Sequence, residues 1–135
     1  MSKYTEKALE LHARGYNCAQ AVVCAFKDKL DMDETALYKI AEGFGSGIGN
    51  RKYLCGALTG AVMVSGLASS SGDAQNSTKK QTYKISSEIA DYFQVSCGGV
   101  NCEDIKGINT GKVKASCQDC ILFAVKAVED IVFGK

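Results

Sequence analysis

Apolar residues recur along this chain mostly at intervals of three and four residues, and they seldom alternate with polar ones. This spacing places them on one face of an α-helix, and the absence of proline also favours helices over strands. A first helix is expected from about Ser2 or Thr5 to Arg14, where Gly15 supplies the left-handed turn that ends it. The pattern predicts an all-α fold, a helical bundle of about five to six helices.

The next segments continue the helical pattern up to a glycine-dense loop. Asn17 is a good N-cap and Gln20 stands at the capping-box position, so a second helix should begin here. A third helix is expected over residues 33–42, and a Gly-rich loop over 43–52 follows it. After the loop we expect a buried helix that starts at Cys55, whose small residues would let neighbouring backbones approach closely.

The second half of the chain predicts two more long helices. Ile85, Ile89 and Phe93 recur at four-residue spacing and mark the first of them, and residues 121–133 form an apolar final helix. Between them, residues 96–114 predict a glycine-containing loop with at most one short helix.

Length and composition bound the class of protein. A chain of 135 residues with 46% hydrophobic residues can bury one good core, so we expect a single domain over residues 1–135. No apolar run reaches signal-peptide or membrane-span length, which predicts no membrane span and a cytoplasmic location. The net charge is +1 with interleaved signs, so nucleic acid is not expected as a partner.

The seven cysteines change this picture, because the chain does not need cross-links to fold. In a reducing compartment, several thiols indicate metal binding or catalysis rather than a disulfide framework. The candidate chemistry is therefore that of cysteine.

Three of the cysteines directly follow a helix-capping residue. They occur as Asn17-Cys18, Asn101-Cys102 and Ser116-Cys117, each with a capping-box residue at the right spacing. Each thiol would lie in a first helical turn, where backbone N–H groups and the helix dipole stabilise a thiolate and lower its pKa.

Cys55 is the most suggestive single cysteine. Gly56 and the small residues after it would leave the sulfur accessible to a partner atom or a ligand, and Arg51 would stabilise a thiolate or a small anion there. The preceding loop contains no G-x-G-x-x-G and follows a helix, so it is not a dinucleotide loop. It is either a flexible connector or backbone that must pass close to Cys55.

Cys117 and Cys120 form a Cys-x-x-Cys pair, which puts two sulfurs on one face of a helix and suits a redox dithiol or two ligands of one metal. With Cys97 and Cys102 the spacing is close to that of a zinc ribbon, but the first pair and the middle segment deviate from it. The haem-attachment and common ferredoxin patterns are missing. Cys24, in mid-helix without a cap, is expected to serve packing, and for Cys97 structure and function stay equally open.

Four blocks of the sequence together resemble the C_GCAxxG_C_C family, whose members are described as redox-active because of their cysteines. The blocks are Asn17-Cys18-Ala-Gln-Ala-Val, Gly45 through Cys55-Gly-Ala-Leu-Thr-Gly-Ala, Cys102-Glu-Asp-Ile and Cys120-Ile-Leu-Phe, and they cover nearly the whole chain. The resemblance implies that Cys18, Cys55, Cys102 and Cys120 are the family's four cysteines, with Cys117 as a competing choice for the last. It implies no substrate.

The leading hypothesis is that these four cysteines converge and act in electron or thiol transfer with a redox partner protein, as a switching dithiol or as ligands of an iron–sulfur cluster. In a dithiol, Cys18 or Cys55 would attack and Cys102 or Cys120 would resolve. A second hypothesis is a zinc or other metal-binding tetrathiolate protein without redox turnover. A third is a structural or adaptor protein that forms a homodimer through the small-residue face of the helix that starts at Cys55.

Overall fold

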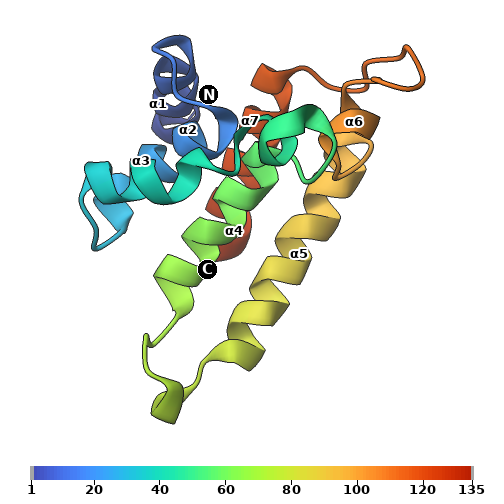
Figure 1. The fold of residues 1–135 in the computed structure, drawn as a ribbon. Helices are drawn as coiled ribbons and strands as arrows, with labels where there is room; N and C mark the ends of the chain where they lie inside the picture. Colours follow the sequence, from blue (N-terminus) through green and yellow to red (C-terminus); the bar gives the residue numbers. More distant parts are fainter. Residues whose placement is uncertain (1, 135) are drawn as a thin grey trace.

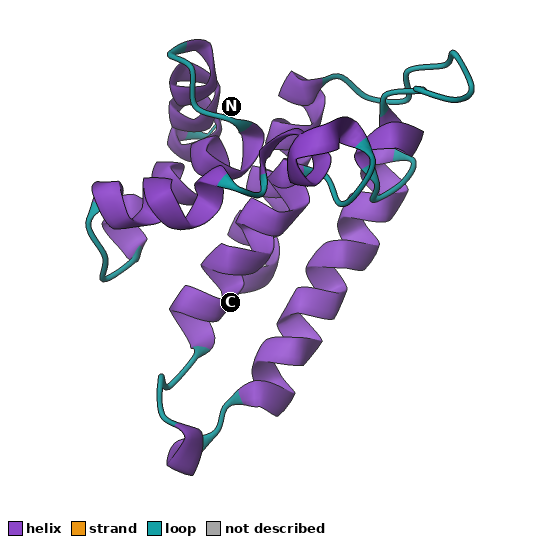
Figure 2. Cartoon of the chain, in the orientation of Figure 1, coloured by secondary structure: helices purple, strands orange, loops and turns teal. Residues whose placement is uncertain are grey.

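The computed structural model of the chain describes residues 2–134, and these residues contain helices and loops but no strand (Figure 1 and Figure 2). The all-α prediction is confirmed. The seven α-helices are α1 (Lys3–Ala13), α2 (Cys18–Ala25), α3 (Glu34–Glu42), α4 (Gly56–Ser69), α5 (Lys79–Cys97), α6 (Cys102–Ile105) and α7 (Cys117–Ala127). Four short helical turns accompany them: η1 (Lys27–Lys29), η2 (Gly47–Arg51), η3 (Ala74–Asn76) and η4 (Val128–Val132).

The helices divide into a long pair and a group at one end of it. Helices α4 and α5 run side by side in opposite directions and are joined at their far end through η3, while α1, α2 and α3 gather at the other end (Figure 1). Helix α7 packs against α1, α4 and α5, and α2 packs most extensively against α4. This arrangement brings the starts of α2, α4, α6 and α7 to the same end of the molecule.

Two of the three predicted capping boxes are present. Asn17 accepts a hydrogen bond from the N–H of Gln20, whose side chain accepts one from the N–H of Asn17. Ser116 and Asp119 make the same reciprocal pair at the start of α7. Asn101 makes no side-chain cap, so the third capping box was wrong, and α6 is a single turn held by backbone contacts instead.

Helix α4 lies against α2 at a distance that only glycine allows. A Cβ atom at Gly60 would lie 2.8 Å from the backbone oxygen of Ala19, and one at Gly56 would lie 3.1 Å from the backbone nitrogen of the same residue. The expected close approach of backbones at the small-residue helix is therefore confirmed. It sets the position of Cys55 and Cys18, which stand at the starts of these two helices.

This close approach predicts opposite effects for two glycines of α4. Gly60→Ala should lower the free energy of unfolding by about 1–3 kcal/mol, because the new methyl group meets the backbone of α2. A Cβ atom at Gly66 would have no other atom within 4 Å, so Gly66→Ala should instead raise stability by about 0.5–1 kcal/mol through better helix propensity. Urea unfolding followed by circular dichroism measures both. Equal effects at the two positions would contradict the packing argument.

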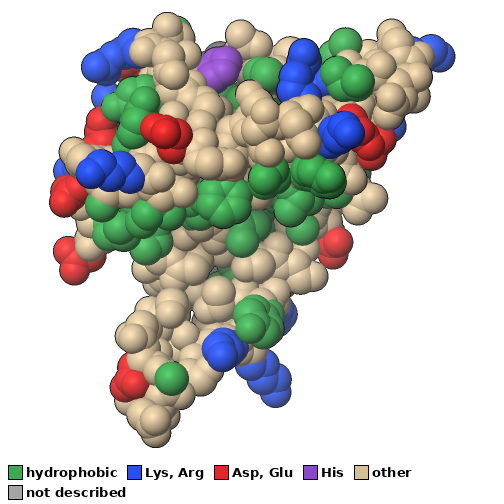
Figure 3. Space-filling view, viewed as in Figure 1, with side chains coloured by type: hydrophobic (Ala, Val, Ile, Leu, Met, Phe, Trp, Pro, Cys, Tyr) green, Lys and Arg blue, Asp and Glu red, His purple; other side chains and the backbone are tan. Residues whose placement is uncertain are grey.

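A band of hydrophobic side chains crosses the face shown in Figure 3, over α3 and the upper parts of α4 and α5. The large hydrophobic side chains that are exposed include Ile40, Phe44, Leu54 and Leu67, and a groove of about 530 Å³ opens between α4 and α5. The predicted homodimer stays a prediction. Among residues 2–134, no helix combines the length and the apolar character needed to cross a membrane.

Candidate functional site

The starts of four helices surround one small cavity. It has a volume of about 160 Å³, and its walls include the side chains of Cys18, Cys55, Cys102 and Cys117, together with Gly56 and Arg51. Cys120, one helical turn after Cys117, is fully buried at 0% exposure. Six of the seven residues that the sequence singled out for the site therefore line one cavity, and the seventh, Cys120, lies one helical turn after Cys117.

Two backbone hydrogen bonds fix Cys55 next to Cys102. The N–H of Cys55 donates to the carbonyl oxygen of Val100 at 2.8 Å, and the N–H of Cys102 donates to that of Tyr53 at 2.7 Å. They form an isolated bridge between two segments that lie far apart in the sequence. The bridge positions both sulfurs without any cross-link, and all seven cysteines are free thiols.

The thiols are arranged in contacting pairs. The side-chain interactions that set their pKa values pair Cys18 with Cys117 and Cys55 with Cys120, and Cys120 also interacts with Cys97. We call Cys18 and Cys117 the outer pair, because both are half-buried and line the cavity. We call Cys55 and Cys120 the inner pair, because both are buried.

Within the outer pair, the two thiols differ sharply in acidity. The side-chain interaction with Cys18 lowers the pKa of Cys117 to about 5; burial opposes this shift, and Lys106 and His12 reinforce it electrostatically. The same interaction and burial raise the pKa of Cys18. At neutral pH the pair therefore holds one thiolate, on Cys117, and one thiol, on Cys18.

The other thiols of the cluster stay protonated at neutral pH. The hydrogen bond to Cys120 and burial raise the pKa of Cys55, against the N–H groups of Ala57 and Leu58. For Cys120, the bond from Cys55 lowers the pKa, but contact with Cys97 and burial outweigh it and bring the pKa to about 12. Burial also raises the pKa of Cys102.

The expectation that every helix-start thiol is acidic was therefore wrong for Cys18 and Cys102, and of the three only Cys117 follows it. Desolvation and contact between thiols outweigh the field of the helix start in this cluster. Because only one member of a contacting pair can ionise easily, the position of a cysteine in its helix does not decide which one does.

Lys106 is a member of the site that sequence reasoning missed. Its Nζ donates to the carbonyl oxygen of Ala115 at 2.9 Å and lies 3.8 Å from Sγ of Cys120. Burial lowers the pKa of Lys106, but the neighbouring cysteines raise it by more, and at neutral pH the Cys117 thiolate supplies the negative charge, so the ammonium stays charged. A signal did exist in the sequence, because Lys106 stands four residues after Cys102, a spacing that places both on one helix face.

The Gly-rich loop takes an unusual path over the cavity. Ser46, Ile48 and Arg51 have left-handed φ angles of 52°, 61° and 65°, which are unfavourable for residues with a side chain. This path places Arg51 at the cavity, where its charge lowers the pKa of Cys102 against the larger effect of burial. Of the two interpretations of the loop, the structure supports backbone that must pass close to the cysteines.

Gly47 is the point of closest passage, and it allows a matched test. A Cβ atom there would lie 2.6 Å from Cβ of Cys102, whereas a Cβ atom added at Gly49, which is also left-handed, would have no other atom within 4 Å. Both alanine variants should lose about 1 kcal/mol to backbone strain, but Gly47→Ala should lose more and should also expose Cys102. Urea unfolding and the rate of iodoacetamide labelling at Cys102 measure this. Equal labelling rates in the two variants would contradict the contact.

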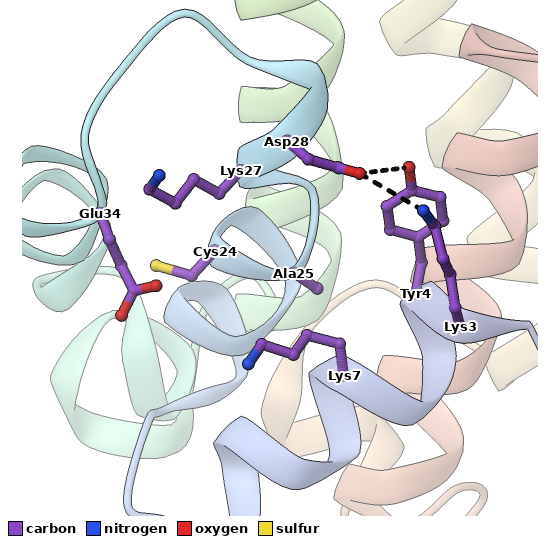
Figure 4. Close-up of a pocket in the computed structure, with 8 residues that line it drawn as sticks. All are labelled: Lys3, Tyr4, Lys7, Cys24, Ala25, Lys27, Asp28 and Glu34. Carbon is purple, nitrogen blue, oxygen red and sulfur yellow. Dashed lines mark hydrogen bonds and ion pairs between the residues drawn. The ribbon is translucent and has the colours of Figure 1, made fainter.

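Cys24 lies apart from the cluster, in a separate pocket between α1, α2 and α3 (Figure 4). Its sulfur points toward Glu34, with Lys7 and Lys27 to either side. Burial, together with the charge of Glu34, raises its pKa to about 11, and no other cysteine contributes to that shift. Cys24 is thus a natural control for experiments on the remaining thiols.

The thiol cluster has no ready-made metal geometry in the described part of the chain. Among residues 2–134, no group of three or more histidine, cysteine, aspartate or glutamate side chains is arranged to hold a metal ion.

Comparison with known proteins gives one match. The model of the family described as "Putative redox-active protein (C_GCAxxG_C_C)" matches residues 16–131, a span that contains every residue of the cavity except His12. No curated protein and no solved structure matches the chain.

Proposed function

The chain belongs to the C_GCAxxG_C_C family, and from this premise we propose that it is a thiol–disulfide redox protein whose working dithiol is the outer pair, Cys18 and Cys117. The observation that carries the proposal is the position of both thiols at the wall of one cavity, where each shifts the pKa of the other and that of Cys117 is lowered to about 5. A ready thiolate beside a thiol is the arrangement that disulfide exchange requires.

The proposed reaction has two steps. The Cys117 thiolate attacks one sulfur of a partner disulfide, forms a mixed disulfide and releases the first half of the partner as a thiolate. Cys18 then attacks Sγ of Cys117 and releases the second half, and the proton of Cys18 goes to solvent or to a released thiolate. The protein gives up two electrons and becomes a disulfide, and the partner is reduced to two thiols.

These roles differ from those that the sequence suggested, in which Cys18 or Cys55 attacks and Cys102 or Cys120 resolves. We propose Cys117 as the nucleophile and Cys18 as the resolving thiol. Their interaction lowers the pKa of Cys117 and raises that of Cys18, so Cys117 is the one that ionises. The inner pair, Cys55 and Cys120, supports a second dithiol that is out of reach of large partners.

Disulfide mapping tests this proposal. Reduced, metal-free protein is treated with less than one equivalent of diamide, and its peptides are analysed by mass spectrometry without reduction. We expect the disulfide between Cys18 and Cys117 to be the first to form. The control variant Cys24→Ser should give the same first disulfide as the unchanged protein. A first bond elsewhere, or no bond, would overturn the assignment of the outer pair.

Metal binding is the second candidate function, and one observation favours it. Cys18, Cys55, Cys117 and Cys120 are close enough for each to affect the pKa of another, and thiolates are the ligands that iron–sulfur clusters and zinc take in proteins. These residues would hold the metal, which would supply electron transfer as a cluster or structural support as zinc. Metal analysis and visible absorption of protein purified without oxygen test this, with Cys24→Ser retaining the metal and Cys18→Ser losing it.

A further inference from the structure

The cavity at the outer pair carries a charge pattern that the thiol chemistry does not explain. His12, Arg51 and Lys106 all line it, and none of its lining residues is an aspartate or a glutamate. The first turns of α6 and α7 do carry carboxylates, Glu103, Asp104 and Asp119, but these do not reach the cavity wall.

The two permanent cations are not neutralised by carboxylates. In residues 2–134 the ion pairs join Lys3 to Asp28 and Arg14 to Glu10, and neither involves Arg51 or Lys106. Disulfide exchange ionises one thiol of the outer pair at a time, so Arg51 and Lys106 still leave the cavity an excess of positive charge. The starts of α2, α4 and α7 add partial positive charge at the same place.

The size of the cavity limits what can enter it. A volume of about 160 Å³ is that of about five water molecules, since each occupies about 30 Å³ in the liquid. One end of a small, flexible molecule fits such a space, whereas a folded protein surface does not.

From size and charge together we propose that the substrate of the outer pair is a low-molecular-weight disulfide that carries carboxylate groups. One carboxylate lies between Arg51 and Lys106, and this places the disulfide sulfur before Cys117. Electrons and atoms balance as in the exchange described above, with two small anionic thiols as products. The inference rests on the proposed function, because it names the substrate of that dithiol.

Rates with three matched disulfides test the substrate class. The probes are 3,3′-dithiodipropionate, bis(2-hydroxyethyl) disulfide and cystamine, which are similar in size and differ in charge. Each rate of oxidation of the protein is divided by the rate of the same probe with 2-mercaptoethanol. The normalised rate should be highest for the dianion and lowest for the dication, with a range of about 10-fold or more at low salt, as electrostatic focusing gives. The range should shrink in 0.5 M salt.

A neighbouring lysine supplies the matched variant. Arg51→Gln should lower the normalised rate of the dianion about 3- to 10-fold and that of the neutral probe by a much smaller factor. Lys52→Gln removes the same charge from a residue that does not line the cavity, and it should change neither. Equal normalised rates for the three probes, or equal effects of the two variants, would overturn the proposal.

A binding measurement separates this proposal from the proposed function. Suberate has the chain length of the dianionic probe but no sulfur, and 1,8-octanediol is its neutral counterpart. In NMR titrations, suberate should shift the amide signals of Gly47 and Gly56, and the diol should not. If suberate binds but no disulfide oxidises the protein, the cavity binds anions but the proposed dithiol function is wrong. If the disulfides oxidise the protein, but suberate does not bind and the three probes react at equal normalised rates, the dithiol function stands and the proposal of an anionic substrate is wrong.

Discussion

Cys117→Ser is expected to slow the reduction of a small disulfide at pH 7 by about 10-fold. The other thiols that line the cavity, Cys18, Cys55 and Cys102, all have raised pKa values and are mostly protonated at this pH. The greater intrinsic nucleophilicity of a more basic thiolate offsets part of this loss of ionised thiol, since the Brønsted slope is about 0.4–0.5. Release of thiol from a neutral disulfide, followed by absorbance, measures the rate.

Cys18→Ser should fail at a different step. This variant keeps the nucleophile but lacks the resolving thiol, so it should release one thiol per protein instead of two and retain the other half of the disulfide on Cys117. Mass spectrometry of the intact protein detects this adduct. Cys24→Ser should behave as the unchanged protein, because Cys24 lies outside the cluster. A stable adduct on any residue other than Cys117 would contradict the assigned nucleophile.

The sequence predicted the features of the site that depend on local chemistry. The capping boxes of Asn17 and Ser116 mark the starts of two helices. These two motifs are enough to place Cys18 and Cys117 in first helical turns. The small residues after Cys55 predicted a close approach of α4 to its neighbour, and the approach exists at Gly60. Such features follow from a few consecutive residues and need no knowledge of the tertiary fold.

The pairing of thiols could not be predicted, because it depends on how distant helices pack. From the sequence, a pairing of Cys18 with Cys55 or Cys102 is as plausible as one with Cys117. The packing of α2 against α4 and α7 decides for Cys117. Lys106 was missed for the same reason. Its position directly after α6 follows from the local sequence, but its place beside Cys120 depends on the hydrogen bond to Ala115, at the end of a long loop.

The acidity of Cys117 depends on these tertiary contacts, which predicts a distinctive pH profile. The rate of iodoacetamide labelling at Cys117 should be nearly constant from about pH 6 upward and should fall tenfold per unit below a midpoint near 5, where the thiolate takes up its proton. An ordinary cysteine loses reactivity already below about pH 8.5. Peptide mass spectrometry of the reduced, metal-free protein between pH 4 and 9 gives this profile residue by residue.

The largest cause of this low pKa is the hydrogen bond from Cys18, so removing the donor should raise the midpoint. A hydrogen bond to a charged group is worth about 1.5–3 kcal/mol, and one pKa unit corresponds to about 1.4 kcal/mol, so Cys18→Ala should shift the midpoint upward by about 1–2 units. Cys18→Ser retains a donor and should shift it less. Cys24→Ser should leave it unchanged. If the midpoint stays near 5 in Cys18→Ala, the outer pair is not what makes Cys117 acidic, and Lys106 and His12 must carry the effect instead.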